Sequence, residues 1–359
     1  MGEHERVERD YRSYVVTRRS VLGLLVGLVV VAASFAIVVG PTNVSINDVL
    51  RILLAGPGGE SVASTIVWNI RLPRVLGAAV IGASLALSGA VMQSVLNNPL
   101  GSPYTLGISQ AAMFGAAAAI VFLGAGSITV GETLGVIFVN PYVVTTVAFL
   151  TSLSSAGVIL ALAKYRGASP ETMILTGIAM GSLFTAGTTA IQYVASQSDL
   201  ASIVFWSFGD VGRATWQDVA IVSAVLVPTV IYVLRHSWAY NALDAGDETA
   251  RSVGVDVESV RNRGMLVASL VTALSVAFVG IIGFVGLVVP HVVRKLLGNN
   301  KAFLLPASAL VGALLLLVAD TAARTVFSPS VLPVGIVTSF VGAPFFIYLV
   351  VRGKEYWKR

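Results

Sequence analysis

The chain of 359 residues contains no cysteine, only three histidines and few charged residues, which make up 11% of the sequence. The absence of cysteine excludes disulfides, thiolate metal sites and cysteine nucleophiles. A typical soluble domain is about one quarter charged. With 56% hydrophobic residues and a mean hydropathy of +0.85, this chain is not an ordinary soluble protein. We therefore predict an all-α integral membrane protein that binds no nucleic acid, because its net charge of +5 is better explained by membrane topology.

Motifs for catalysis are also missing. The sequence has no GxxxxGK[ST] phosphate-binding loop, no GxGxxG after a strand and no HExxH pair. Its histidines, His4, His236 and His291, are far apart in sequence. These absences predict a chain with no catalytic residues, no metal site and no cofactor of its own.

Long uncharged stretches predict the membrane spans, because about 20 apolar residues are needed to cross a hydrocarbon layer of about 30 Å. A proline-broken turn at 97–103 divides the long uncharged stretch between Arg74 and Glu132 into two spans. The stretch 265–293 is ambiguous, since three glycines lie between Gly280 and Gly286. A break there gives ten spans in total, and an unbroken helix gives nine.

The basic residues favour ten spans. With that number, 18 of the 23 lysines and arginines share one side with both termini, whereas nine spans would separate the two basic termini. Lys and Arg are enriched in cytoplasmic loops, so both termini are predicted to be cytoplasmic. The remaining five basic residues would lie outside: Arg51, Arg71, Arg74, Arg213 and Arg324.

This topology divides the chain into a cytoplasmic segment (1–19), one permease domain (20–351) and a cytoplasmic tail (352–359). The eighth segment, near 284–297, is short for a full crossing. Small residues four apart on the second span, Ala78, Gly82, Ala86 and Ala90, predict close helix packing.

One long cytoplasmic connection, from Arg235 to Arg263, contains a predicted short helix between Ala245 and Gly254. Asp247 and Glu248 suit its first turn, and Gly254 can end it in a left-handed conformation. A short helix across the base of a bundle is suited to docking a soluble partner, although a solvated loop helix explains the composition equally well.

A series of motifs, in order over nearly the whole chain after Pro41, resembles the permease subunits of type II ABC importers, which take up iron(III)-siderophores, haem and cobalamin. The matching segments include 71–74, 89–93, 98–100, 106–107, 177–180, 205–209, 246–254, 283–291, 319–324, 332–336 and 342–344. Each segment is weak alone, and their order is specific.

The resemblance implies a homodimer in the cell membrane, with two cytoplasmic ATPase subunits that hold ATP and Mg, and an extracytoplasmic substrate-binding protein. It also implies four groups of site residues. The coupling helix, at about 243–255, would contain Ala245, Gly246, Asp247, Glu248, Ala250, Arg251 and Gly254. The cytoplasmic gate would contain Asn98, Leu100 and Glu171, and the surface that docks the binding protein would contain Arg71, Arg74 and Arg324. The translocation path would be lined by Met180, Thr185, Thr188, Gln192, Val337 and Phe340.

Several of these assignments have simpler alternatives. Asn98 and Leu100 could form only a tight turn, and Glu171 could serve only the N-terminus of its helix. Arg324 could pair with Asp320, four residues earlier on the same helical face. Asp320 could instead couple transport to protons, because intramembrane acids are often functional.

Two main functions therefore compete. The motif series favours an import permease driven by ATP hydrolysis on a partner chain, so this chain would not itself be an enzyme. The alternative is an ion-coupled secondary transporter that uses Asp320, and a passive anchor would leave the gate and coupling motifs unexplained. The sequence does not identify the cargo, and we rank iron(III)-siderophore first, then cobalamin or haem.

Overall fold

Helices form almost all of the structure, a computed structural model that describes residues 3–40, 42, 44–59, 61–129, 136–138, 140–165, 169–326 and 330–352. Within these residues one antiparallel hairpin pairs β1 (Ser127–Thr129) with β2 (Val136–Phe138), with Ser127 opposite Phe138. The predicted inner-side residues Arg166, Lys354, Lys358 and Arg359 lie outside the described part of the chain.

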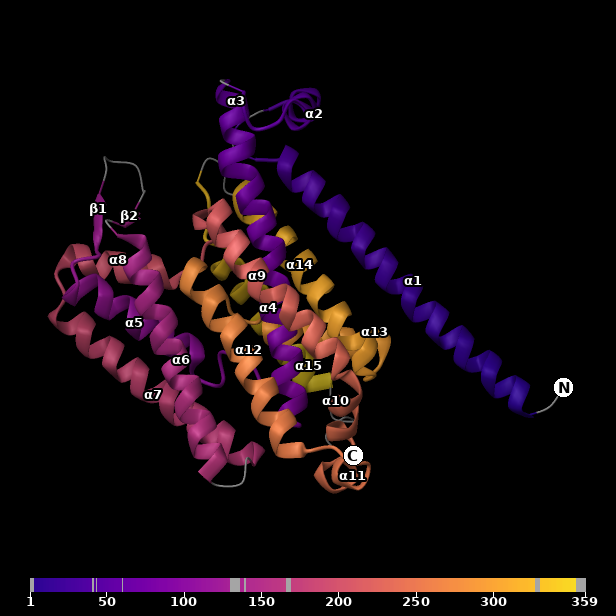
Figure 1. Ribbon diagram of the computed structural model, residues 1–359. Coiled ribbons are helices and arrows are strands. Elements are labelled where there is room, and N and C mark those ends of the chain that lie inside the picture. Colours follow the sequence, from indigo (N-terminus) through magenta and orange to yellow (C-terminus); the bar gives the residue numbers. More distant parts are fainter. Residues whose placement is uncertain are drawn as a thin grey trace.

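The helices follow one another along the chain with short connections (Figure 1). Their bounds are α1 Glu3–Val38, α2 Ile46–Ala55, α3 Val62–Thr65, the π-helix η1 Ile66–Arg71, α4 Leu72–Val95, α5 Ile108–Phe122, α6 Pro141–Tyr165, α7 Pro170–Val194, α8 Gln197–Ser207, the 3-10 helix η2 Val211–Arg213, α9 Trp216–Arg235, α10 Ser237–Asp244, α11 Asp247–Ser252, α12 Val257–Val279, α13 Val285–Leu297, α14 Lys301–Thr325 and α15 Val334–Arg352.

Local sequence explains where the membrane helices begin. The Ser169 hydroxyl accepts a hydrogen bond from the Thr172 amide, and Pro170 occupies the first position of α7, where its missing N–H costs nothing. α9 begins with a reciprocal capping box between Thr215 and Asp218. These caps fix where α7 and α9 start after the polar loops that precede them.

Seven helical segments in the described part of the chain are long and apolar enough to cross a membrane. They are Arg12–Val38, Val62–Val95, Pro141–Tyr165, Pro170–Val194, Trp216–Arg235, Val257–Val279 and Lys301–Thr325, and α5 and α15 are shorter apolar helices. Apart from the short hairpin of β1 and β2, the described residues form helices and their connections, and these apolar segments agree with the predicted all-α membrane protein.

The predicted break in the stretch 265–293 is also confirmed. α12 ends at Val279, Gly280 follows with φ +82°, and α13 begins only at Val285. α13 has 13 residues, so it is short, as expected for the eighth segment.

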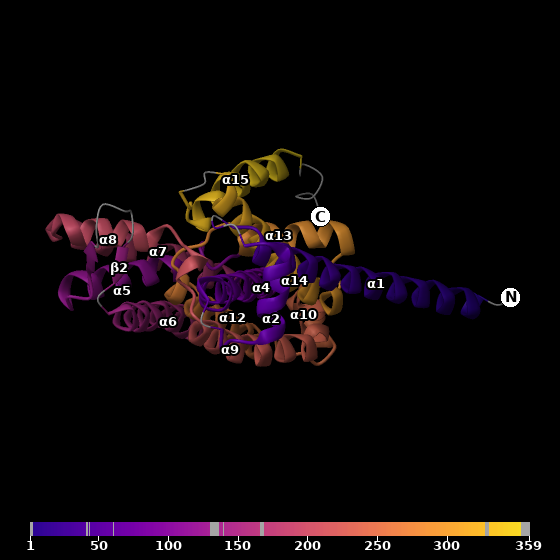
Figure 2. The same cartoon turned by 90° about the horizontal axis from the view of Figure 1, so that it is seen from above.

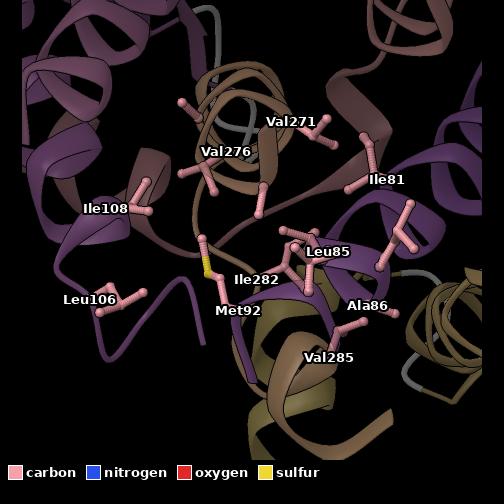
Figure 3. Close-up of a cluster of buried hydrophobic side chains, with 14 of the residues drawn as sticks. Ile81, Leu85, Ala86, Met92, Leu106, Ile108, Val271, Val276, Ile282 and Val285 are labelled. Carbon is pink, nitrogen blue, oxygen red and sulfur yellow. The ribbon is translucent and has the colours of Figure 1, made fainter. Parts of the chain in front are cut away.

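α4 occupies the centre of the helix arrangement. It packs against α14, α12, α13 and α9, and the view in Figure 2 shows it enclosed by these helices. Figure 3 shows Leu85 and Met92 of α4 among apolar side chains from α12 and from the segment that joins α12 to α13. α1 extends away from this core and contacts mainly α14 (Figure 1).

The row of small residues on α4 confirms the predicted close packing. A Cβ placed on Gly82 would come within 2.3 Å of the Gly312 carbonyl oxygen on α14, and one on Gly89 within 1.8 Å of the Gly286 carbonyl oxygen on α13. Both backbones therefore approach α4 more closely than any side chain allows.

We predict that Gly82→Val lowers the melting temperature of the purified protein in detergent, because the new side chain separates α4 from α14. Overpacking of this kind costs about 1–3 kcal/mol or more. Gly27→Val on α1 is the control, since no atom lies within 4 Å of a Cβ there. Equal melting temperatures for the two variants would contradict the packing.

Candidate translocation path and coupling segment

A charge cluster joins α4 and α14 at the end of the structure that carries α2 and α3 (Figure 1). The Arg74 guanidinium donates to Asp320 Oδ1 at 2.8 and 3.0 Å, and its Nη2 lies 3.4 Å from Asp210 Oδ1. Arg324 Nε forms an ion pair with Asp320 Oδ2 at 3.0 Å. The Asp320 carboxylate is almost fully buried between two arginines, which supplies the opposite charge that a buried acid needs.

Two arginines also close the end of α1. The Ile37 and Val38 carbonyls each accept from Arg71 Nη1 at 2.7 Å, and Arg71 Nη2 binds the Thr42 carbonyl. Arg324 donates to the Ala36 and Val39 carbonyls at 3.1 Å. The final carbonyls of a helix have no partner within the helix, so these side chains supply the missing donors.

The predicted pair between Asp320 and Arg324 is confirmed, and Arg74 is an additional partner that the sequence did not indicate. All three arginines expected at the binding-protein surface have partners within this chain. Arg71 and Arg324 are each only 3% exposed. Their role in docking stays a prediction, and the burial of their side chains argues for a structural one.

Two other segments, around Gly209 and Gly335, pack against the break between α12 and α13. The Asp210 amide donates to the Val279 carbonyl at 2.8 Å, and the Gly335 amide donates to the Gly209 carbonyl at 2.9 Å. A Cβ on Gly209 would come within 2.1 Å of the Ile281 carbonyl oxygen. Irregular backbone within a membrane is stable only when neighbouring protein groups satisfy it, and here the Asp210 amide satisfies the Val279 carbonyl at the end of α12.

A cavity of about 500 Å³ lies beside this break. Four separate parts of the chain line it: residues 102–109, the end of α8 at 207–208, residues 281–287 and the start of α15 at 335–340, with Leu85 of α4. Its wall is mainly apolar and includes Phe208, Phe284 and Phe340, with hydroxyl groups from serines and Tyr104.

Of the residues predicted for the path, Phe340 lines this cavity and is also 79% exposed, and Val337 lies nearby on α15. Met180, Thr185, Thr188 and Gln192 lie on α7, none of them against the cavity. The Thr185 and Thr188 hydroxyls donate to the Gly181 and Phe184 carbonyls of their own helix, so they add little polarity to the α7 surface. The path assignment stays a prediction.

The proposed gate lies in the turn after α4. The Asn98 side-chain oxygen accepts from the Leu100 amide at 2.8 Å, which stabilises the turn itself, and the Leu100 side chain is 36% exposed. Glu171 is exposed in the first turn of α7. Beyond the turn, Gly107 lies against Gly177 and Gly181, so the start of α5 is seated on α7. Gating by these residues stays a prediction.

The predicted coupling segment consists of two helices. α10 ends at Asp244 and α11 begins at Asp247, so Ala245 and Gly246 form the joint and do not begin a single helix. Gly254 has φ +85°, as the predicted left-handed helix end requires. Ala250 is fully buried, whereas Ala245, Glu248 and Arg251 are exposed. α11 therefore has one face seated on the bundle and one face open, at the opposite end from α2 and α3 (Figure 1).

Residues 28–352 match the FecCD transport family. The chain belongs to this family. A relative in Methanocaldococcus jannaschii, provisionally named as an ABC transporter permease, is 51% identical over 96% of this chain and 98% of its own length. The haemin transport system permease of Yersinia pestis is 35% identical over 95% of this chain and 98% of its own.

A solved structure has the same fold as this FecCD-family chain. It is an inward-facing structure of a proposed metal-chelate type ABC transporter, with a TM-score of 0.79 and 30% identity, and the match covers 93% of this chain and 99% of that one. The resemblance deduced from the sequence motifs is thus confirmed.

Within the described residues of this family member, no group of three or more His, Asp or Glu side chains is placed to hold a metal ion. The sequence did not indicate the cavity lining at 102–109, 207–208 and 281–287. Its only sequence signal was the partial overlap of these segments with the family motifs at 106–107, 205–209 and 283–291.

We predict that Asp320→Asn strongly destabilises the purified protein, because Arg74 and Arg324 would lose their shared carboxylate while buried. Removal of one partner of a buried pair costs about 3–5 kcal/mol. Thermal unfolding in detergent measures the effect, with the exposed Glu258→Gln as the matched control. A melting temperature equal to that of the control would show that the cluster does not stabilise the fold.

Proposed function

We propose that this chain is the permease subunit of an ATP-binding-cassette importer for a metal chelate, with iron(III)-siderophore as the first choice of cargo and cobalamin or haem next. The observation that carries this proposal is the seated helix α11, with its exposed face, in a chain of the FecCD family. The chain lacks a nucleotide-binding loop, so energy would enter through a partner ATPase docked on that face.

The proposed topology has ten spans with both termini cytoplasmic. Besides the seven long spans, the shorter helices α5, α13 and α15 supply the remaining three. Arg18 of α1 donates to the Leu296 carbonyl at the end of α13, and Tyr14 packs against Phe303 at the start of α14. These contacts support a shared side for the start of α1 and the basic residues Arg294 and Lys301.

In the proposed cycle two copies enclose a path between them, with α7 and α15 of each copy as walls. The large exposed apolar side chains on these helices, such as Leu183 and Phe340, support an apolar surface of this kind. An extracytoplasmic binding protein would deliver the chelate at the end that carries α2 and α3, and two ATPase subunits would dock on the α11 helices. A wall with few charges would not retain a bulky chelate once the gate opens.

Reconstitution tests the proposal. The permease, its ATPase and the cargo-loaded binding protein are placed in liposomes, and uptake of radioactively labelled ferric siderophore, cobalamin and haem is compared. We expect uptake of one cargo only with ATP and the ATPase subunit present. Uptake without the ATPase that stops when a proton gradient is dissipated would refute the proposal and favour ion coupling through Asp320.

Charge reversal tests the docking face directly. We predict that Arg251→Glu reduces the amount of ATPase subunit that copurifies with the permease, because the reversed charge would no longer complement the charge on the ATPase surface. Arg51→Glu, at another exposed arginine, on α2 at the opposite end, should leave copurification unchanged. The docking assignment fails if both variants retain the ATPase equally.

A further inference from the structure

The last turn of α4 has one carbonyl that neither α4 nor the turn after it satisfies. The Met92, Ser94 and Gln93 carbonyls accept from the amides of Leu96, Asn97 and Asn98, respectively. The remaining carbonyl, that of Val95, accepts from Arg261 Nε of α12 at 2.7 Å. A donor from another helix therefore completes the end of α4, immediately before the turn that holds Asn98 and Leu100.

The same guanidinium binds the coupling segment. Arg261 Nη2 and Nη1 donate to the two carboxylate oxygens of Asp247, at 2.8 and 3.2 Å. The Arg261 side chain is 3% exposed and that of Asp247 38%. Arginine is suited to this double role, because its planar fork binds a carboxylate with two parallel hydrogen bonds while Nε remains available.

A series of polar side-chain contacts also connects α10 to the same end of α4. Asp244 of α10 forms an ion pair with Lys301 at 2.6 Å and accepts from the Asn299 amide nitrogen at 2.7 Å. Asn299 Oδ1 accepts from Arg294 Nε at 3.0 Å, and Arg294 Nη2 donates to Gln93 Oε1 at 3.1 Å. This series of contacts ends at Gln93, two residues before Val95.

We propose that Asp247 and Arg261 link α11 to the turn after α4, so that a displacement of α11 by the ATPase moves Asn98 and Leu100. Arg261 is then a positioning residue for gating. The series of side-chain contacts from Asp244 to Gln93 holds α10 against the same end of α4. The inference rests on the proposed function, because it assigns a route to the energy that an ATPase would supply.

A merely structural role for Arg261 predicts something different. If Arg261 only completed the end of α4, loss of the Asp247 carboxylate would leave the Val95 contact and the gate in place. The distinguishing variant is therefore Asp247→Asn, which removes one charge from the bidentate pair at a partly exposed position and keeps the size of the side chain.

The test measures the accessibility of position 100 in the proposed gate, so it does not require a known cargo. Because the chain has no cysteine, Leu100→Cys introduces a single reactive thiol. Its rate of labelling by a membrane-impermeant maleimide is measured in the complex with the ATPase, without nucleotide and with ATP plus vanadate. In this background, Asp247→Asn, Arg261→Lys and their combination are compared with the control Glu258→Gln, which changes an exposed acid in the first turn of α12. ATPase copurification and basal ATP hydrolysis are recorded for each variant.

We expect the labelling rate to respond to nucleotide in the Leu100→Cys background and in Glu258→Gln. In Asp247→Asn and Arg261→Lys the response, measured on the complexes that retain the ATPase, should fall by about fivefold or more, the size of a typical coupling between sites. The nucleotide response of the double variant should fall no further than that of the more affected single variant, because both changes break the same contact between Asp247 and Arg261.

The link is refuted if Asp247→Asn responds as Glu258→Gln does, or if the two losses multiply in the double variant. Should Arg261→Lys not fold, Asp247→Asn alone decides between these outcomes. A lack of nucleotide response in the unmodified Leu100→Cys background is a separate result, which would count against the proposed function itself and with it the link.

Discussion

Backbone carbonyls at the ends of membrane helices must find donors, since lipid offers none, and arginine side chains meet this need repeatedly in this protein. Arg71 and Arg324 close the end of α1, Arg261 closes the end of α4, and Arg18 binds the end of α13. Each of these side chains comes from a different part of the chain. The helix ends are therefore also the points where distant segments are joined.

Close backbone contacts complement these polar joints. Gly82 and Gly89 allow α14 and α13 to approach α4, and Gly209 and Gly335 surround the break before α13. The cavity lies where four separate parts of the chain meet. One helix, α4, thus borders the cavity through Leu85, binds the charge cluster of Asp320 through Arg74, and ends at the turn proposed as the gate.

Hydropathy and charge were enough to predict a helical membrane protein and the break between Gly280 and Val285, because exclusion of charge from lipid acts on sequence directly. The pair of Asp320 and Arg324 was predictable because it lies within one helical turn. The role of Arg261 was not predictable, because a count of basic residues treats every arginine as an exposed marker of topology. Its burial depends on where α4 ends and where α11 lies, which are tertiary contacts. For the same reason Arg71 and Arg74 were interpreted as outer surface charges, although the fold turns them inward.

A distance measurement tests most directly whether α11 and the turn after α4 move as one unit. Spin labels on Val253→Cys and Asn97→Cys, both exposed positions, report this distance within one subunit when labelled chains are diluted with unlabelled ones. In an ATPase complex that retains its activity, the account predicts the same distance with and without ATP, while the distance between the two Asn97→Cys positions of a dimer changes. A change within the subunit as large as the change between subunits would contradict it.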